Sequence, residues 1–379
     1  MKKLNILVLS WRGPNHPNAG GAEQSTFAHA KGWVSAGHKV SLFTSYYEGA
    51  KREEKIAGVN VKRSGAQFFG VQAKAFKWYL FEKHPKFDLI VDEFHGIPFF
   101  TPLYVRTKKL AFIHEVTKEV WRLNPWPKPF NLIPYIVGTL FEPLIFKIFY
   151  KNIPFMTVSN STKKDLENWG IDEKNIFIVH NGVSNKLLKG IKSKEKKITI
   201  TYLGAISKDK GIEDALEVFS LLKLQNNDFQ FWVIGKSDAG YLSYLNKNAK
   251  KLGIEDNINF WGYVSEDKKN NLLARSHLLI NPSVREGWGL VVIEAARMGT
   301  PTVGYNVAGL RDSIIDEKSG ILTKKNTPEE MADNVLRLMR DEPRYIRMCQ
   351  EAKKWSNKFS WANSVEQSLS LLKEVYENA

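Results

Sequence analysis

The sequence alternates short apolar runs with helix-period segments, and it does so twice. In the first half, apolar runs at 4–9, 39–44, 88–91, 109–113, 155–158 and 176–179 accompany helical patterns at 22–36, 71–83 and 162–169. In the second half, runs at 198–203, 229–234, 258–261, 277–280 and 302–305 accompany helical patterns at 212–224, 241–252 and 267–274. Apolar runs of this length between helices are typical of parallel strands covered on both faces. The sequence therefore predicts an α/β chain with two doubly wound, Rossmann-like sheets.

The chain is too long for one ordinary hydrophobic core, because 379 residues exceed the size at which single cores stop growing. We expect a first domain over 1–184 and a second over 185–360. Between them, 185–197 is rich in lysine and poor in apolar residues, which predicts a solvated linker. Thr327-Pro328-Glu329-Glu330 has the form of a capping box, so a helix should begin there. Two more helices should follow, at about 342–358 and 361–377.

The charge is strongly basic: 55 Lys and Arg residues stand against 40 Asp and Glu residues, a formal net charge of +15. Such an excess favours nucleic acid, an anionic membrane face or a phosphorylated substrate as the partner. The sequence has no recognisable nucleic-acid-binding module, so we do not expect nucleic acid. The single cysteine, Cys349, excludes an internal disulfide and suits a reducing compartment, so we expect a cytoplasmic protein.

Two carboxylates flank a glycine-rich turn in the stretch 282–303. Glu286 precedes Gly287-Trp288-Gly289, and Glu294 lies in the helical pattern that starts at Leu290. Glycines let a ligand approach the backbone, and the free amide groups of a helix start suit a phosphate. The two carboxylates can then accept hydroxyl hydrogen bonds at separate places on one elongated ligand. A sugar and a ribose joined by a diphosphate have that layout.

This string resembles the Glu-x7-Glu signature of the retaining nucleotide-sugar glycosyltransferases of family four, which usually have Phe in place of Trp288. The resemblance implies the GT-B fold, two Rossmann-like domains facing a central cleft, with the last helix, 361–379, packing back on the first domain. It implies that Glu286 orients the transferred sugar, that Glu294 holds the ribose, and that no metal or cofactor is needed. It also places Gly287, Trp288, Gly289 and Leu290 at the donor. Carboxylates that face away from the gap between the domains, or that are buried against basic partners within the second domain, would overturn the enzyme assignment made from these residues and leave only the architecture.

Gly20 and Gly21 lie in the loop after the first apolar run, at the start of a helical pattern. Adjacent glycines there let the backbone lie against a diphosphate, although a plain loop-to-helix turn has the same sequence. The family has a Gly-Gly-Ala-Glu-like loop at this place, which implies donor binding. The loop lacks the Gly-x-Gly-x-x-Gly fingerprint, which argues against a nicotinamide-dependent enzyme.

His114 follows the apolar run 109–113, and open parallel sheets present ligand groups at the carboxyl ends of their strands. By position alone, a structural histidine and a functional one are equally good interpretations. The resemblance implies contact with the donor sugar.

The segment 203–211 resembles a family segment in which an arginine and a lysine hold the leaving diphosphate. Lys210 matches the lysine, but Ala205 stands where the family has the arginine. One fewer cation weakens the stabilisation of a dianionic leaving group unless another residue replaces it. The candidate replacements are Lys208, Arg285 and Arg12. Further along, Val264, with Lys269 nearby, resembles the family position next to the nucleobase.

The stretch 121–150 combines apolar and aromatic residues with basic flanks, including Trp126-Pro127-Lys128-Pro129-Phe130. This composition suits a surface that dips into a bilayer or holds a lipid-linked acceptor, and the alternative is a buried connecting helix. Residues 130–150 are numerous enough to span a bilayer, but prolines, a glycine and charged residues interrupt them, so we do not expect a spanning helix. With the basic excess, we expect peripheral association with an anionic membrane.

We therefore expect a retaining glycosyltransferase that moves a sugar from a nucleotide-diphosphate donor to a glycan or lipid-linked acceptor. The family implies that the acceptor hydroxyl attacks on the leaving-group face and that the donor phosphate receives its proton. Two alternatives stay open: a catalytically weak nucleotide-sugar-binding subunit, for which Ala205 is the hint, and a GT-B sugar-nucleotide epimerase. The sequence leaves the sugar, the base and the acceptor undetermined.

Overall fold

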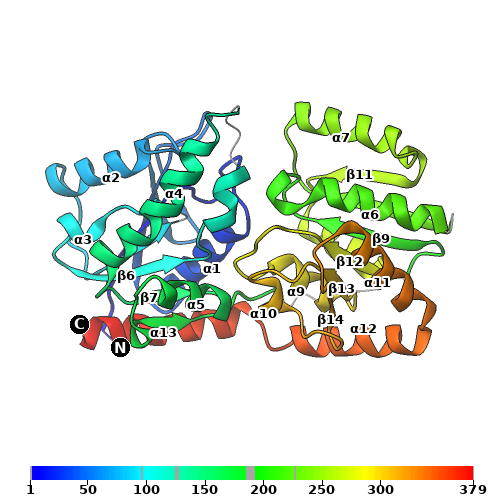
Figure 1. Cartoon of the computed structure of the whole chain (residues 1–379). Coiled ribbons are helices and arrows are strands. Elements are labelled where there is room, and N and C mark those ends of the chain that lie inside the picture. The colour runs from blue at the N-terminus through cyan, green and yellow to red at the C-terminus, as the bar shows by residue number, and fades with distance from the viewer. Residues whose placement is uncertain (1, 95–96, 124–127, 185–192, 226–227, 379) are drawn as a thin grey trace. The chain divides into compact units, whose positions relative to one another are not determined.

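The structure is a computed structural model, and it describes residues 2–94, 97–123, 128–184, 193–225 and 228–378 (Figure 1). Contacts between Cα atoms divide the chain into two compact units. The first comprises Met1–Gly182 with Trp361–Ala379, and the second comprises Val183–Ser360. The division therefore falls two residues before the domain end expected from the sequence, and the last helix belongs to the first unit.

The first unit is built on an eight-stranded sheet in the order β3-β4-β2-β1-β5-β6-β7-β8. Its strands are β1 Asn5–Ser10, β2 Lys39–Thr44, β3 Glu53–Ile56, β4 Val59–Arg63, β5 Leu89–Phe94, β6 Lys108–Ile113, β7 Phe155–Thr157 and β8 Ile176–Ile178. Its helices are α1 Gly21–Ser35, α2 Gly70–Phe81, α3 Thr101–Tyr104, α4 Leu132–Ile145, the π-helix η2 Phe146–Tyr150, α5 Asn160–Asn168 and α13 Trp361–Asn378. All neighbouring strands are parallel except β3 and β4. The doubly wound pattern is confirmed, but the β3–β4 hairpin was not anticipated.

Helix α13 packs on α1 within the first unit. The Trp33 indole donates a hydrogen bond of 2.9 Å to Ser368 Oγ, and His29 Nδ1 lies 3.0 Å from the same oxygen. Burial lowers the pKa of His29 to about 4, so the ring is neutral at physiological pH. These buried polar contacts fix the register of α13 on α1.

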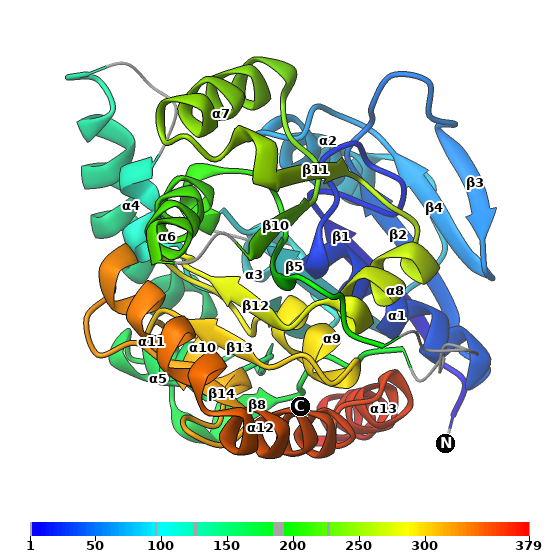
Figure 2. The ribbon, with the colours of Figure 1, turned by 90° about the vertical axis from the view of Figure 1, so that its right-hand side faces the viewer.

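The second unit is built on a six-stranded parallel sheet in the order β11-β10-β9-β12-β13-β14, the strand order of a Rossmann fold (Figure 2). Its strands are β9 Ile198–Leu203, β10 Phe229–Ile234, β11 Ile258–Gly262, β12 Leu278–Asn281, β13 Thr302–Gly304 and β14 Gly320–Leu322. Its helices are α6 Ile212–Gln225, α7 Ala239–Lys251, α8 Glu266–Arg275, α9 Leu290–Arg297, α10 Leu310–Ser313, α11 Pro328–Arg340 and α12 Glu342–Ser356. Along β12, Leu278 and Ile280 join one core cluster and Leu279 joins another, as a strand covered on both faces requires.

The carboxyl end of the expected linker is anchored in the second unit, so the prediction of a solvated linker is wrong there. Lys194 Nζ donates to the carbonyl oxygens of Ser276 and Gly299 and to Thr300 Oγ1. Burial lowers the pKa of Lys194 to about 8. The contacts explain the burial, because three oxygens replace the water that a lysine usually keeps. Residues 185–192 lie outside the described part of the chain.

Helix α11 starts at the predicted capping motif, but only half of the capping box forms. Thr327 accepts a hydrogen bond from the Glu330 amide, whereas the Glu330 carboxylate accepts from the amides of Lys324 and Lys325. The acidic side chain thus holds the preceding loop instead of returning to the helix cap.

Helix α4 is exposed, so the alternative of a buried connecting helix is wrong. By length and composition alone, Leu132–Tyr150 is apolar enough to cross a membrane, with a mean hydropathy of 1.6 and 17% of it buried. The side that packs inward carries Gly138, which lies against the Trp121 ring, and Glu142. Glu142 accepts hydrogen bonds from the Thr117 amide and the Trp121 indole. Residues 124–127, including Trp126, lie outside the described part of the chain.

Candidate functional site

The predicted glycine turn joins the end of β12 to the start of α9 in the second unit. Gly289 is the residue before the helix, with φ +77°, a conformation that side chains other than glycine rarely adopt. Leu290 is the first residue of α9, and Glu294 lies on its second turn, as the sequence predicts. The amide groups of the first turn of α9 therefore follow directly on Gly287-Trp288-Gly289.

Glu286 and Lys210 are in contact within the second unit. Lys210 Nζ lies 3.1 Å from Glu286 Oε2 and 3.4 Å from the Arg285 carbonyl oxygen. Ser283 Oγ donates to the other oxygen, Glu286 Oε1, at 2.8 Å. The side chains of Lys210 and Glu286 stay 23% and 15% exposed, so solvent reaches the pair. A cation beside a carboxylate can bind a phosphate oxygen and a hydroxyl group of the same ligand.

Two glycines place this pair. Gly211, with φ +70°, packs so closely on the loop after β12 that a Cβ atom would lie 2.0 Å from the Pro282 carbonyl oxygen. Gly309, with φ +78°, packs on the other side, where a Cβ atom would lie 2.2 Å from the Glu286 carbonyl oxygen. The Glu286 amide donates to the Ala308 carbonyl oxygen at 3.2 Å. Three loops therefore fix the backbone of Glu286, and sequence reasoning missed the part played by Gly309.

Glu294 pairs with Lys269 of α8. Their charged groups are 2.8 Å apart, and Lys269 also lies 2.7 Å from Glu266. Burial raises the pKa of Glu294, and Lys269 opposes that effect only in part. Burial alone would lower the pKa of Lys269, but the two glutamates outweigh it and raise that pKa. Val264 lies just before α8, so the predicted nucleobase contacts and the predicted ribose contact belong to neighbouring elements.

Both signature carboxylates thus have a lysine partner inside the second unit. This arrangement counts against the prediction that Glu286 and Glu294 bind hydroxyl groups of a donor. Each carboxylate already contacts a lysine, so neither is a free hydrogen-bond acceptor for a hydroxyl group. A ligand would share each carboxylate with its lysine or displace the lysine toward a phosphate.

The three candidate replacements for the missing arginine differ in availability. Lys208 is exposed, in a short 3-10 turn three residues after the exposed Ala205. Arg285 is only 5% exposed. Arg12, in the first unit, pairs with Glu23 at 2.7 Å and donates to the Asn18 carbonyl oxygen. Lys208 is therefore the best placed of the three to meet a soluble anion.

Trp288 does not present its ring to a ligand. The side chain is 3% exposed and packs edge-on against Phe359 at 5.0 Å between ring centroids. The ring belongs to the core beneath the turn, so the predicted contact of Trp288 with the donor stays a prediction for its main chain alone. The main chain of Gly287, Trp288 and Gly289 keeps its place before α9.

In the first unit, Gly20 and Gly21 are exposed at the start of α1, as the sequence predicts. The Glu23 carboxylate already accepts a hydrogen bond of 2.6 Å from the Gly20 amide. One amide of this helix start is therefore occupied by the protein's own carboxylate, which makes it a weaker anion site than the start of α9.

His114 lies directly after β6 and is 4% exposed. Its Nε2 is 3.3 Å from Thr26 Oγ1 and 3.6 Å from Glu93 Oε1, and its carbonyl oxygen accepts from Thr162 Oγ1. Glu93, near the carboxyl end of β5, is a residue that sequence reasoning missed. The available signal was an acidic pair, Asp92-Glu93, inside an otherwise apolar run.

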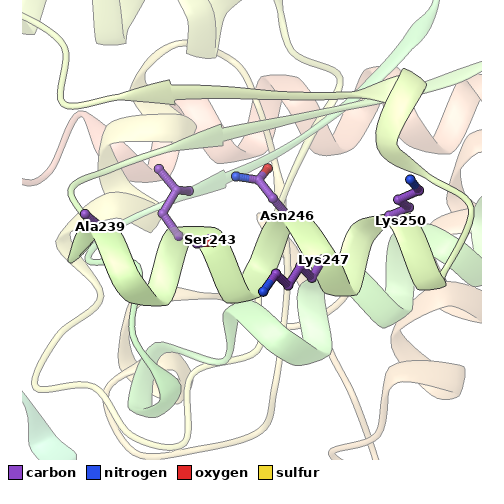
Figure 3. A pocket seen from close by; sticks show the side chains of 6 residues that line it. Ala239, Ser243, Asn246, Lys247 and Lys250 are labelled. Atoms are coloured by element: carbon purple, nitrogen blue, oxygen red, sulfur yellow. The ribbon is translucent and has the colours of Figure 1, made fainter.

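A hollow on helix α7 does not form a competing site. A surface hollow of about 470 Å³ is lined by residues of α7 alone, which gives it a single wall (Figure 3). Its lining residues are Ala239, Leu242, Ser243, Asn246, Lys247 and Lys250. Among the described residues, no group of three or more His, Cys, Asp or Glu side chains is arranged to hold a metal ion.

Comparison with known proteins places both halves of the chain. The family model described as Glycosyltransferase Family 4 matches residues 19–186, and the one described as Glycosyl transferases group 1 matches residues 183–355. An uncharacterised glycosyltransferase of Methanocaldococcus jannaschii is 24% identical, with 99% of each chain covered. Sucrose-phosphate synthase of Thermosynechococcus elongatus matches over 100% of both chains with a TM-score of 0.84 at 16% identity. Anabaena HepE, solved with UDP and glucose, covers 98% of this chain with 100% of its own, with a TM-score of 0.72 at 17% identity.

Proposed function

The chain belongs to the GT-B glycosyltransferases, with a family-4 domain followed by a group-1 domain, and we propose that it transfers a sugar from a nucleoside-diphosphate donor with retention of configuration. The observation that carries the proposal is the Lys210–Glu286 pair next to the glycine turn that starts α9. Lys210, Lys208 and the amide groups of α9 supply positive charge for the diphosphate, and Glu286 accepts from the sugar hydroxyl groups. The Glu294 carboxylate accepts hydrogen bonds from the hydroxyl groups of the ribose.

In the proposed reaction, an acceptor hydroxyl oxygen bonds to the anomeric carbon on the leaving-group face while the bond to the diphosphate breaks. The released phosphate oxygen takes the proton of the acceptor hydroxyl group. The products are a glycoside and a nucleoside diphosphate. This route needs positive charge at the leaving group but no enzymic nucleophile and no resident metal. We propose a glycan or a lipid-linked molecule as the acceptor, and His114 of the first unit as a ligand of the transferred sugar.

The function is tested in two steps. Thermal shift with UDP, GDP and ADP, and then with their sugars, identifies the donor, because a ligand that binds the native state raises the melting temperature with its concentration. NMR of the glycoside formed from that donor then gives the anomeric configuration. An inverted product would overturn the mechanism. Binding without transfer or donor hydrolysis, across a panel of acceptors, would show a nucleotide-sugar-binding subunit instead.

Substitution of the two signature glutamates should have different effects on donor binding and turnover. We expect Glu294→Ala to raise the Kd of the donor about 10- to 100-fold, since a hydrogen bond to a charged group contributes roughly 1.5–3 kcal/mol. Glu286→Ala should leave Kd nearly unchanged and lower kcat about 100-fold. Calorimetry with the donor and steady-state kinetics measure the two effects. The matched control is Glu266→Ala, which removes the exposed partner of Lys269 and should keep the wild-type Kd. Near-wild-type constants in both glutamate variants would contradict the assignment.

The exposed side of α4 and η2 forms an apolar surface in the first unit. It consists of large side chains that are each 47–63% exposed: Leu132, Ile133, Ile136, Val137, Leu140, Phe141, Leu144 and Ile148. Contiguous apolar surfaces of this kind are rare on proteins without a partner for them. The neighbouring charges are mainly basic, with Lys128, Lys147 and Lys151 exposed, while Glu142 is buried beneath the helix.

We propose that this apolar surface lies in the interface of an anionic membrane. Apolar side chains enter the acyl boundary while lysines at the edges meet anionic headgroups. The charge complementarity favours a bilayer over a second copy of the chain, because two copies of the same basic surface would repel each other. A lipid-linked acceptor would be presented at the same membrane.

Co-sedimentation with liposomes tests the membrane proposal. The protein should pellet with phosphatidylglycerol vesicles at low salt, pellet less at high salt, and stay largely in solution with phosphatidylcholine vesicles. Leu140→Glu together with Phe141→Glu should abolish pelleting without changing the melting temperature, since both side chains are exposed. A protein that stays in solution with anionic vesicles at low salt would refute the proposal. A concentration-dependent dimer that the same variant disrupts would assign the surface to a second copy instead.

A further inference from the structure

Two neighbouring acidic residues of β5 are buried in different ways. Asp92 accepts hydrogen bonds from the Phe99 and Thr101 amides, from Thr101 Oγ1 and from the Tyr150 hydroxyl group. Glu93 is 0% exposed, yet neither of its carboxyl oxygens has a hydrogen-bond partner among the residues that the structure describes. Buried polar groups are nearly always hydrogen-bonded, because losing water without replacement is costly. Hydrogen bonds therefore explain why Asp92 can be buried, whereas no hydrogen bond explains the burial of Glu93.

Glu93 faces Nε2 of the His114 ring. Glu93 Oε1 lies 3.6 Å from His114 Nε2, and Thr26 Oγ1 lies 3.3 Å from the same nitrogen. Glu93 pairs in register with Ser10 on β1 and with Phe112 on β6, so it lies at the carboxyl edge of the sheet. The Ser10 hydroxyl group donates to the Arg12 carbonyl oxygen. A small movement of either side chain would bring Glu93 and His114 into hydrogen-bonding distance.

Burial favours a protonated Glu93. Burial raises its pKa from the ordinary 4.5 to about 8, and the nearby Glu23 carboxylate adds to the rise. Ser10 and Arg12 oppose it, Arg12 being already paired with Glu23, and Asp92 on the same strand raises it slightly further. The titratable groups around Glu93 are thus Arg12, Glu23, Asp92 and His114, and burial, the largest effect, leaves a proton on this carboxyl group at neutral pH.

We propose that Glu93 is a positioning residue that shares one proton with His114 Nε2 and so fixes the protonation of the imidazole. The proton lies either on the Glu93 carboxyl group or on Nε2, and its transfer between them changes no overall charge. In both arrangements His114 Nδ1 keeps its own hydrogen, so the ring stays a donor through Nδ1. The role of that donor, toward an oxygen of the transferred sugar, rests on the proposed function.

The first test needs no substrate. In ¹⁵N NMR of the ligand-free full chain, His114 should show a hydrogen on Nδ1 at pH 7, with assignment by His114→Gln. Glu93→Gln, whose amide still donates to Nε2, should keep that signature up to pH 9. Glu93→Leu, which leaves Nε2 without this donor, should convert His114 to a mixture of tautomers. Asp92→Asn is the matched control, and it should lower stability without changing the tautomer. A His114 signature that is the same in all four proteins would overturn the proposal.

Stability and turnover give two further readouts. Between pH 4.5 and about 8, Glu93 is protonated in the native protein and ionised in the unfolded chain. The contribution of Glu93 to the free energy of unfolding therefore falls as pH rises through this window. Glu93→Gln should therefore melt at a higher temperature than the wild type at pH 8.5 and at a similar temperature at pH 5. Wild-type kcat should fall above about pH 8. Glu93→Leu should lose at least 10-fold in kcat, and Glu93→Gln should restore most of this loss and lack the alkaline fall.

The outcomes separate the inference from the proposed function. If no donor is turned over, but the tautomer and the melting temperature follow Glu93 as described, the positioning role stands and the glycosyl transfer fails. If transfer occurs and the wild type shows neither the alkaline fall nor the pH-dependent stability difference from Glu93→Gln, the positioning role fails and the transfer stands.

Discussion

Lys210→Ala is expected to lower kcat/KM for glycosyl transfer by about 1,000-fold, roughly 4 kcal/mol of transition-state stabilisation. The negative charge on the leaving diphosphate grows as its bond to the sugar breaks, so a cation at that place acts most strongly in the transition state. The effect should be at the upper end of the range for one group, because Ala205 leaves the site without the arginine that the family shares. Steady-state kinetics with the identified donor measure the loss.

Two further variants decide whether the charge of Lys210 is the cause. Lys208→Ala removes an exposed cation from the same short turn. It should lower kcat/KM by no more than about tenfold, because a solvated side chain binds an anion weakly. Ala205→Arg introduces the missing cation at an exposed position and should recover part of the activity in the Lys210→Ala background. A Lys210→Ala variant within tenfold of the wild type would contradict the assignment. It would mean that Lys210 serves only to neutralise Glu286.

The strand and helix pattern of this protein was readable because both sheets are almost wholly parallel. Strand β10, with one polar residue in six, has the predicted bounds, since strands buried on both faces tolerate few polar residues. The predicted bounds of β2 and β9 are also correct. The β3–β4 hairpin was missed because its outer strand is largely charged and lies at the sheet edge. Strand β14 was missed because it begins with a glycine and has only two apolar residues between the polar segments 316–319 and 323–326.

The site was predictable where it depends on local sequence and unpredictable where it depends on packing. The glycine turn, the start of α9 and the second-turn position of Glu294 all follow from residues close together in the chain. The lysine partners of the two glutamates are 76 and 25 residues away, and no local pattern gives their distance. Trp288 is similar, because an aromatic residue between two glycines suits a ligand and a core equally well until Phe359 is seen to pack on it. The role of Glu93 could not be predicted from the sequence, because it follows from the lack of hydrogen bonds to a buried carboxyl group, which only a structure shows.

Gly309→Ala is expected to destabilise the second unit by about 3 kcal/mol and to disable catalysis at the same time. About 1 kcal/mol comes from forcing alanine to φ +78°, and about 2 kcal/mol from the overlap of its Cβ with the Glu286 carbonyl group. The neighbour is backbone on a loop held by Ala308 and Ser283, so relief requires Glu286 to move. Misplacing a reacting group by about 1 Å costs on the order of 100-fold in rate. Thermal unfolding and kcat at saturating donor measure the two effects.

Gly253→Ala is the control for Gly309→Ala, since Gly253 has φ +65° and no atom within 4 Å of a Cβ. It should cost only the backbone part, about 1 kcal/mol, and leave kcat unchanged. If both variants lose the same stability, the loop around Glu286 yields freely and Gly309 does not place it. The double variant Gly309→Ala, Glu286→Ala separates placement from general damage. When Gly309 acts only by placing Glu286, the kcat of the double variant equals that of Glu286→Ala, because a side chain that is absent cannot be misplaced. Losses that multiply would mean that the glycine supports a further part of the site.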